Sequence, residues 1–134
     1  MDNKKTKILI VEDDKFLVRA IGDHLQREGF EVITAFNGEE GLRDIEQEKP
    51  DLVLLDLIIP QKDGFEVLVE TKGSSDRKIK NIPIVILSNL GQESDIKKGL
   101  ELGAADYLIK TEFSMKGIVK KIKEVLAKQG LTLR

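Results

Sequence analysis

The segment DLVLLDLIIPQKDG, which runs from Asp51 to Gly64, gives the clearest indication of the fold. Its first half is an almost continuous apolar run, which is typical of a strand covered on both faces of a parallel sheet. Asp56 interrupts this run, and the neighbouring sequence offers it no obvious partner. The fold and the chemistry of more distant residues therefore have to explain this carboxylate.

Strand-length apolar segments recur along the chain on both sides of this one. With the central segment LVLLD (52–56), they are KILIV (7–11), EVITA (31–35), IPIVILS (82–88) and DYLIK (106–110). Between them, apolar residues recur at helical spacing, first from Phe16 to Leu25 and again from Met115 to Leu126. Five strands alternating with helices predict a doubly wound α/β fold, in which helices cover both faces of a five-stranded parallel sheet.

Local signals indicate where helices begin and end. Asn37 followed by Glu40 predicts an N-cap with its reciprocal acid, and Pro50 is expected to stop the helix that follows. Asp14, directly ahead of KFLVRAIGDHL, is interpreted as a further N-cap in preference to a direct role in a site. The charged segment KGSSDRKIKNIP (72–83) is interpreted as a mobile surface loop.

The composition is that of one globular domain. Of 134 residues, 40% are hydrophobic and 34% are charged, so we expect a single domain over 1–134, with a core at about 6–128 and a tail or linker at 129–134. Lys plus Arg number 22 and Asp plus Glu number 24, so no overall positive field favours nucleic acid or an anionic membrane. Because the chain has no cysteine and no secretory signal is recognisable, we expect neither disulfides nor thiolate chemistry, and a cytoplasmic location.

Polar side chains end four of the five predicted strands. Glu12 and Asp13 follow the first strand, Asp56 ends the third, Ser88 the fourth and Lys110 the fifth. Ligands of open parallel sheets bind beyond the carboxyl ends of the strands, so these groups are expected to share one cleft. Adjacent carboxylates at a buried strand end repel each other and lose hydration, which a divalent cation with a preference for oxygen would offset.

Each of these residues also has a purely structural explanation, which the sequence leaves open. Asp56 could cap the turn LIIPQKDG, where Pro60 and Gly64 are ordinary loop residues, while Ser88 could satisfy backbone groups and Lys110 could be a surface ammonium. Together, however, the groups suit a transferring phosphoryl group. Mg²⁺ and Lys110 would neutralise its oxygens, Ser88 would donate to one of them, and the Asp56 carboxylate would be the nucleophile.

The motifs resemble the receiver domain of two-component response regulators, of the chemotaxis-regulator type. The resemblance covers nearly the whole chain and rests on ILIVEDD, FNGEEGL, DLVLLDLIIPQKDGFEVL, IPIVILSN and GAADYLIK, in that order, followed by an amphipathic helix. It implies a flavodoxin-like sheet with strand order 2-1-3-4-5. It also implies a phosphoacceptor in a phosphorelay, whose donor is a phosphohistidine on a sensor histidine kinase or phosphotransfer protein.

The resemblance assigns roles position by position. Asp56 matches the phosphoacceptor, and Lys110 matches the phosphate-binding lysine. Asp13 matches the direct Mg²⁺ ligand, with Glu12 reaching the metal through water and the backbone carbonyl of Ile58 supplying a further ligand.

The resemblance also implies a switch, in which Ser88 matches the hydroxyl that moves to the phosphoryl group and Tyr107 the aromatic residue that follows it. Phosphorylation adds charge and acceptor oxygens, so it should bias the loop and helix after the fourth strand. The implied readout surface is formed by the fourth helix, fifth strand and fifth helix, with a downstream protein as its target. A solvated face and a docking patch explain the lysines of this region equally well: Lys97, Lys98, Lys116, Lys120, Lys121 and Lys123.

The chain departs from the family after its lysine, where Thr111 replaces a proline that usually forms a cis peptide. A non-proline cis bond costs about 3 to 4 kcal/mol, so a trans bond is open at this position.

The resemblance also bears on the lifetime of the phosphoryl group. In the family, two residues flank the path of the hydrolytic water: the second residue after the phosphoacceptor and the second residue after the switch hydroxyl. Here they are Ile58 and Leu90, which cannot orient water, so slow autodephosphorylation is predicted.

Other functions fit these residues less well. A phosphatase of the haloacid dehalogenase class needs a second Asp at the position of Ile58, so we expect catalysis only of the chain's own phosphorylation and dephosphorylation. Flavin binding would favour hydroxyls and amides, not carboxylates, after the first strand. The remaining alternative is a receiver-like binding module that phosphorylation does not switch. His24, the one histidine, is expected on a helix surface.

Overall fold

The computed structural model describes residues 4–130 and contains one parallel five-stranded sheet. Its strand order is β2-β1-β3-β4-β5, which confirms the predicted doubly wound, flavodoxin-like arrangement. The strands are β1 (Lys7–Val11), β2 (Glu31–Ala35), β3 (Leu52–Leu55), β4 (Ile84–Ser88) and β5 (Asp106–Ile109).

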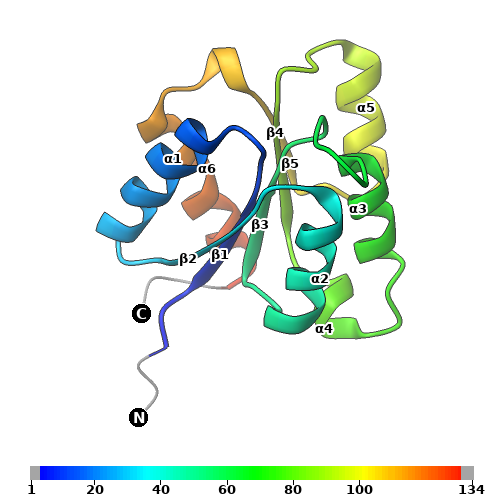
Figure 1. The fold of residues 1–134 in the computed structure, drawn as a ribbon, viewed down its shortest axis with the longest axis horizontal. Coiled ribbons are helices and arrows are strands. Elements are labelled where there is room, and N and C mark those ends of the chain that lie inside the picture. The colour runs from blue at the N-terminus through cyan, green and yellow to red at the C-terminus, as the bar shows by residue number, and fades with distance from the viewer. Residues whose placement is uncertain (1–3, 131–134) are drawn as a thin grey trace.

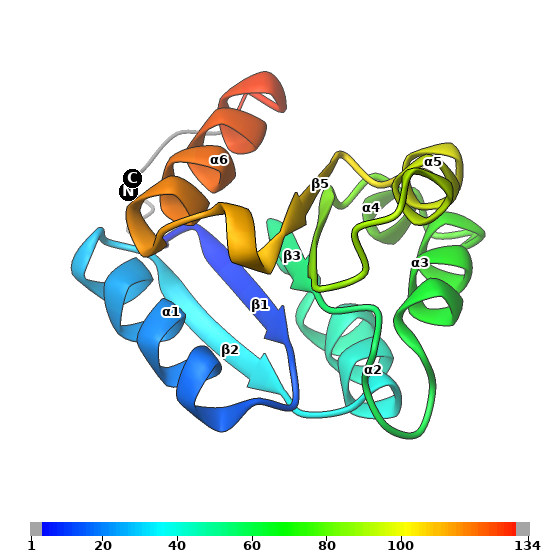
Figure 2. The same ribbon diagram turned by 90° about the horizontal axis from the view of Figure 1, so that it is seen from above.

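Helices cover both faces of the sheet. Figures 1 and 2 show α1 and α6 on one side and α2, α3, α4 and α5 on the other. Their bounds are α1 (Lys15–Arg27), α2 (Gly38–Glu48), α3 (Gly64–Lys72), α4 (Arg77–Lys80), α5 (Glu93–Glu101) and α6 (Met115–Lys128), and a 3₁₀ turn η1 (Lys110–Glu112) follows β5. Within residues 4–130, none of these helices has the length and apolar character needed to cross a membrane.

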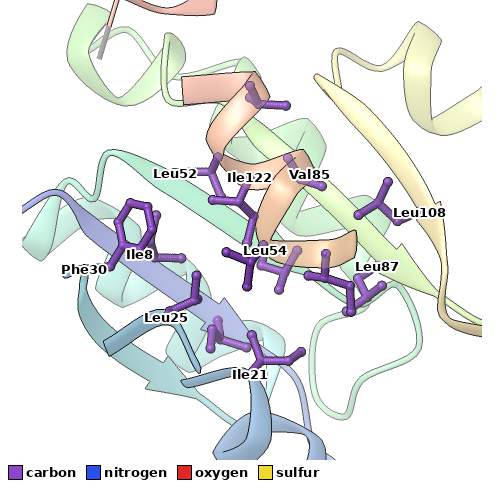
Figure 3. Close-up of a cluster of buried hydrophobic side chains, with 14 of the residues drawn as sticks. Ile8, Ile21, Leu25, Phe30, Leu52, Leu54, Val85, Leu87, Leu108 and Ile122 are labelled. Carbon is purple, nitrogen blue, oxygen red and sulfur yellow. The ribbon is translucent and has the colours of Figure 1, made fainter. Parts of the chain in front are cut away.

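Each central strand contributes to two cores, because successive side chains of a strand point to opposite faces. Ile8 and Ile10 of β1 pack with α1 and α6, whereas Leu9 and Val11 pack with α2 and α3. Figure 3 shows the first of these cores, in which side chains from α1 and α6 lie over the strands around Leu54. The unbroken apolar runs in the sequence follow from this two-sided burial.

The predicted helix caps are confirmed. Asp14 Oδ1 accepts hydrogen bonds from two backbone N–H groups in the first turn of α1. Asn37 Oδ1 accepts from the N–H of Glu40 at 2.9 Å, and the Glu40 carboxylate reaches back to the N–H of Phe36 at 3.3 Å. The helix that Asn37 caps, α2, ends at Glu48 and therefore stops before Pro50 as predicted.

The prediction of a mobile loop at 72–83 is wrong, because this segment contains α4 and is anchored in the second core. Ile79 is only 7% exposed, and Asp76 caps α4 by accepting from the N–H of Lys78 at 2.9 Å. The Lys72 ammonium donates to the carbonyl oxygen of Ile82 at 2.6 Å, and burial lowers the pKa of this lysine. A cap, the buried side chains of Ile79 and Ile82 and the half-buried Lys72 ammonium therefore fix a mostly charged segment.

Three strand ends also differ slightly from the prediction. β3 ends at Leu55 and β5 at Ile109, so Asp56 and Lys110 each lie one residue beyond their strands, and β4 begins at Ile84. Both polar side chains are therefore at the carboxyl edge of the sheet, where the backbone leaves the ladder. Gln129 and Gly130 follow α6, and the rest of the predicted tail at 129–134 lies outside the described residues.

Candidate functional site

The carboxyl edge of the sheet brings together acidic residues that are far apart in sequence. Asp56 follows β3 directly, and Glu12 and Asp13 follow the neighbouring strand β1. Glu12 is 3% exposed and Asp56 is 5% exposed, while Asp13 is exposed to solvent. Carboxylate oxygens of these three residues lie within 4.8 Å of one another.

Lys110 lies at the centre of this cluster. Its Nζ lies 2.7 Å from Glu12 Oε1 and 2.9 Å from Asp56 Oδ2, so one ammonium contacts two buried carboxylates. The lysine comes from η1, directly after β5, and its peptide bond to Thr111 is trans. The replacement of proline by Thr111 therefore does not prevent Lys110 from reaching the acids.

The pKa shifts in the cluster follow from burial and from this ion contact. Burial raises the pKa of Glu12, although the hydrogen bond from Lys110 acts in the opposite direction. Burial alone would lower the pKa of Lys110, but the hydrogen bonds and negative charges of Asp56 and Glu12 outweigh it and raise the pKa. Lys110 is therefore a positive charge at neutral pH.

The donor set fits a hard divalent cation. Three carboxylates and one ammonium leave two negative charges uncompensated when all four groups are ionised, and the ligand atoms available are oxygens, as Mg²⁺ prefers. Asp13 makes no hydrogen bond or ion pair within residues 4–130, so its carboxylate is available as a ligand. Glu12 Oε2 instead accepts from the N–H of Asp14 at 3.0 Å.

The loop after β3 binds Asp56 Oδ1, the carboxylate oxygen that Lys110 does not contact. The N–H of Ile58 donates to Asp56 Oδ1 at 3.2 Å, while the Ile58 side chain is 59% exposed. At the start of α3, Gly64 lies so close to this segment that an added Cβ would be 2.4 Å from the Asp56 carbonyl oxygen. The interpretation of Gly64 as an ordinary loop residue is therefore wrong, since only glycine allows this approach.

Ser88 and Tyr107 lie beside the cluster in a separate hydrogen-bonded unit. Ser88 is fully buried, and its Oγ accepts from the N–H of Leu90 at 3.3 Å. The Tyr107 hydroxyl donates to the carbonyl oxygen of Leu90, and burial raises the pKa of Tyr107 to about 12. Within residues 4–130, no hydrogen bond joins Ser88 to Asp56, so the hydroxyl is directed to its own loop in this structure.

Sequence reasoning missed three features of the site. The ion contact of Glu12 with Lys110 joins residues from opposite ends of the chain, and no local signal indicates it. The Leu90 carbonyl acts through the backbone and is invisible in the sequence. Gly64 could have been identified, because Asp-Gly after a strand indicates a position where backbone segments approach closely.

Asp14 and His24 are not part of the acidic cluster. Asp14 does not contact the Lys110 ammonium and acts as a helix cap. His24 is half-buried beside α6 and not fully on the surface.

The chain matches a known family over most of its length. Residues 8–123 match the response regulator receiver domain family. Among curated relatives, the probable transcriptional regulator ycf27 of Pyropia yezoensis is 43% identical over 126 residues, which cover 94% of this chain and 49% of the relative. The alkaline phosphatase synthesis transcriptional regulatory protein PhoP of Bacillus subtilis is 40% identical over 125 residues, 93% of this chain and 50% of the relative. The chain thus spans about half the length of these relatives.

Solved structures of response regulators have the same fold as this chain. A putative response regulator from Chloroflexus aurantiacus superposes with a TM-score of 0.84 at 33% identity, covering 92% of this chain and 99% of that one. The BeF3-activated N-terminal receiver domain of Klebsiella pneumoniae RstA gives 0.80 at 32% identity, with 90% and 97% covered. The chemotaxis response regulator CheY4 of Vibrio cholerae gives 0.82 at 28% identity, with 90% and 98% covered.

Proposed function

The chain belongs to the response regulator receiver domain family, and we propose that it is the phosphoacceptor of a two-component phosphorelay, with Asp56 as the phosphorylated residue. The proposal rests on one observation above all. The buried Asp56 carboxylate contacts the Lys110 ammonium at 2.9 Å, within a cluster of two further carboxylates. A structural turn cap needs neither the ammonium nor the additional acids.

The residues around Asp56 suit nucleophilic attack on phosphorus. An oxygen of the Asp56 carboxylate forms the new P–O bond as the P–N bond of a phosphohistidine breaks, and the imidazole of the donor takes the electron pair. Lys110, which now neutralises Asp56, then contacts the negatively charged phosphoryl oxygens. Asp13, Asp56 and the Ile58 carbonyl, with Glu12 through water, are the proposed Mg²⁺ ligands, and the metal would supply further neutralisation of these oxygens.

The proposed donor is a sensor histidine kinase or a histidine phosphotransfer protein. Two bulky apolar side chains are exposed, Ile58 beside Asp56 at 59% and Phe16 in the first turn of α1 at 90%, and such side chains favour docking of another protein. Beyond its own phosphorylation and dephosphorylation, we propose no enzymatic activity.

The proposed switch couples the phosphoryl group to the loop between β4 and α5. The Ser88 hydroxyl, now bound to Leu90, would turn to donate to a phosphoryl oxygen, and Leu90 also accepts from Tyr107. A change at Ser88 would therefore release the Leu90 N–H, next to the carbonyl that binds Tyr107. Because α4 is an additional short helix, the proposed readout surface consists of α5, β5 and α6, and a downstream protein is its proposed target.

The test is the intact mass of the protein after incubation with acetyl phosphate, with and without Mg²⁺, beside an Asp56→Asn variant. We expect a single phosphoryl adduct that requires Mg²⁺ and is lost in the variant. An adduct that persists in Asp56→Asn would place the acceptor elsewhere. No adduct under any condition would favour a receiver-like binding module that phosphorylation does not switch.

A further inference from the structure

The two faces of the molecule differ strongly in charge. On one face, α1 contains three Lys and Arg residues and one Asp, and α6 contains five Lys residues and one Glu. On the other, α2, α3, α4 and α5 together contain ten acidic and seven basic residues. The near-neutral total of the chain therefore conceals a basic face built from two helices that are distant in sequence.

These two basic helices border a groove. α1 and α6 lie on the same side of the sheet and contact each other (Figures 1 and 2), and between them lies a groove of about 530 Å³. On the α6 side, Lys116, Lys120 and Lys123 line the groove, followed by Ala127. These positions are separated by four, three and four residues, so they form a single stripe along the helix.

The lysines of this stripe are not neutralised equally. Lys123 forms an ion pair with Glu28, the residue directly after α1, across the groove. Lys116 and Lys120 have no carboxylate within ion-pair distance among residues 4–130 and are exposed. Two uncompensated ammonium groups one turn apart are therefore accessible to a ligand, and the exposed Ala127 continues the stripe.

We propose that the groove between α1 and α6 binds an acidic amphipathic helix of a partner protein. The aliphatic stems of the lysines and Ala127 would contact the apolar side of such a helix, and its Asp or Glu residues, one per turn, would pair with Lys116 and Lys120. The lysine stripe from 116 to 123 spans about 10 Å of helix axis, which matches two turns of a partner helix.

The same residues disfavour a nucleic acid as the ligand. Glu28 and Glu124 line the groove together with the lysines, and their carboxylates would repel phosphates at close range. In a protein partner, a basic residue can lie opposite Glu124 while acids lie opposite the lysines. The groove shares α6 with the proposed readout surface but contains no residue of the Asp56 cluster, and the inference concerns binding by the unphosphorylated protein.

The experiment uses a fluorescently labelled synthetic peptide of about 18 residues, long enough to form a helix in isolation, with Leu and Ala on one side and Glu at i, i+4 and i+7 along the border of that side. Fluorescence anisotropy with the full chain should show binding that weakens as salt is added, and the same peptide with Lys in place of Glu should not bind. In nuclear magnetic resonance spectra, peptide-induced shifts should map to α1 and α6.

The variant Lys116→Glu/Lys120→Glu should weaken binding about tenfold, since exposed ion pairs contribute modestly and two attractions become repulsions. Lys78→Glu/Lys80→Glu on α4, across the sheet, makes the same charge change and should alter binding less than twofold. Lys116→Ala/Lys120→Ala should give an intermediate loss, and it replaces the Glu variant if that variant unfolds.

Four outcomes would overturn the proposal. Equal weakening in the α4 variant would show only long-range attraction by net charge. Shifts outside α1 and α6, or no binding of the acidic peptide, would remove the groove as its site. Tighter binding of a short DNA duplex than of the peptide, lost in the groove variant, would assign the face to nucleic acid.

Discussion

At the level of single residues, Lys110 holds the acidic cluster together. Its ammonium contacts Glu12 and Asp56, both almost completely buried. It therefore offsets the repulsion between these two carboxylates, which would otherwise destabilise the folded state. Asp13 is the member of the cluster that no cation contacts within residues 4–130. The site is therefore arranged for ligand binding at some cost in stability, which is testable at Asp13.

Asp13→Asn removes one negative charge beside two buried carboxylates. Without Mg²⁺, we expect the free energy of unfolding to rise by up to about 1 kcal/mol, because the remaining acids repel one another less. The same change removes a proposed metal ligand, so the Mg²⁺-induced rise in Tm should shrink. Thermal melts with Mg²⁺ and with EDTA measure both effects. Asp23→Asn, an exposed acid on α1, is the control, and an undiminished Mg²⁺ effect in Asp13→Asn would contradict the ligand assignment.

Ile58 and Leu90 bear on the lifetime of the proposed phosphoryl group. Ile58 is exposed beside Asp56, and neither side chain can hydrogen-bond a water. We expect Ile58→Asn combined with Leu90→Gln to shorten the phosphoryl half-life about tenfold, since a positioned water lowers the barrier to hydrolysis. The loss of the phosphoryl adduct with time, followed by intact mass, measures it. Val69→Asn, an exposed apolar residue of α3, should leave the half-life unchanged.

At the level of elements, the start of α3 positions the acceptor. Gly64→Ala places a Cβ 2.4 Å from the Asp56 carbonyl oxygen and 2.5 Å from Leu57 Cα, so backbone must move. We expect a loss of about 1 to 3 kcal/mol in the free energy of unfolding and slower phosphorylation by acetyl phosphate. Urea unfolding and adduct formation measure the two effects.

A matched glycine shows whether this effect belongs to the position. At Gly22, in the interior of α1, a Cβ would meet Val32 at an ordinary 3.7 Å. Gly22→Ala should therefore stabilise the protein by up to about 1 kcal/mol through helix propensity. If both substitutions stabilised the protein, the close approach of α3 to Asp56 would not be a real constraint.

The contact of β5 with the loop before α5 has a pH signature through Tyr107. Its phenol has a pKa of about 12 in the folded protein against an ordinary value of 10.0, chiefly because it is buried. The unfolded chain therefore releases this proton first, and the free energy of unfolding should fall by about 2 to 3 kcal/mol as pH rises from 10 to 12, while below pH 10 the contribution is fully present.

Tyr107→Phe separates this effect from other titrations. The variant should lack the fall above pH 10, and at neutral pH it should lose about 0.5 to 1.5 kcal/mol because the Leu90 carbonyl loses its donor. Tyr107 is the only tyrosine and the chain has no tryptophan, so the ultraviolet absorbance of tyrosinate reports its pKa directly. A measured value near 10 would contradict the buried position of the phenol.

The elements differ in how far sequence predicts them. The strands and the caps at Asp14 and Asn37 were predictable because apolar runs and capping residues are local signals. The helix α4 was missed because Ile79 is the one apolar residue of its four, Arg77–Lys80, and the burial of Ile79 depends on the distant second core. The pairing of Lys110 with Glu12 likewise depends on strand order and side-chain direction. Sequence indicated which residues would gather at the sheet edge but not which would touch.

For the whole molecule, the decisive feature is that one sheet serves two cores. β1, β3, β4 and β5 contribute alternate residues to both, so neither core can be lost while the strands remain folded. The two layers of helices therefore stabilise each other through the sheet, although they are separated by it. A destabilising substitution in one core should therefore lower the stability of the other core as well.

Ile122→Ala tests this coupling. Ile122 is fully buried in the core beneath α6, and its truncation should cost about 2 to 5 kcal/mol. Tyr107 belongs to the opposite core, so its fluorescence reports on the face that the substitution does not touch. Because the strands are shared, the denaturant midpoint from Tyr107 fluorescence should fall together with that from circular dichroism. If the Tyr107 transition stayed at its original midpoint while the circular dichroism transition moved, the two cores would unfold separately and the sheet would not couple them.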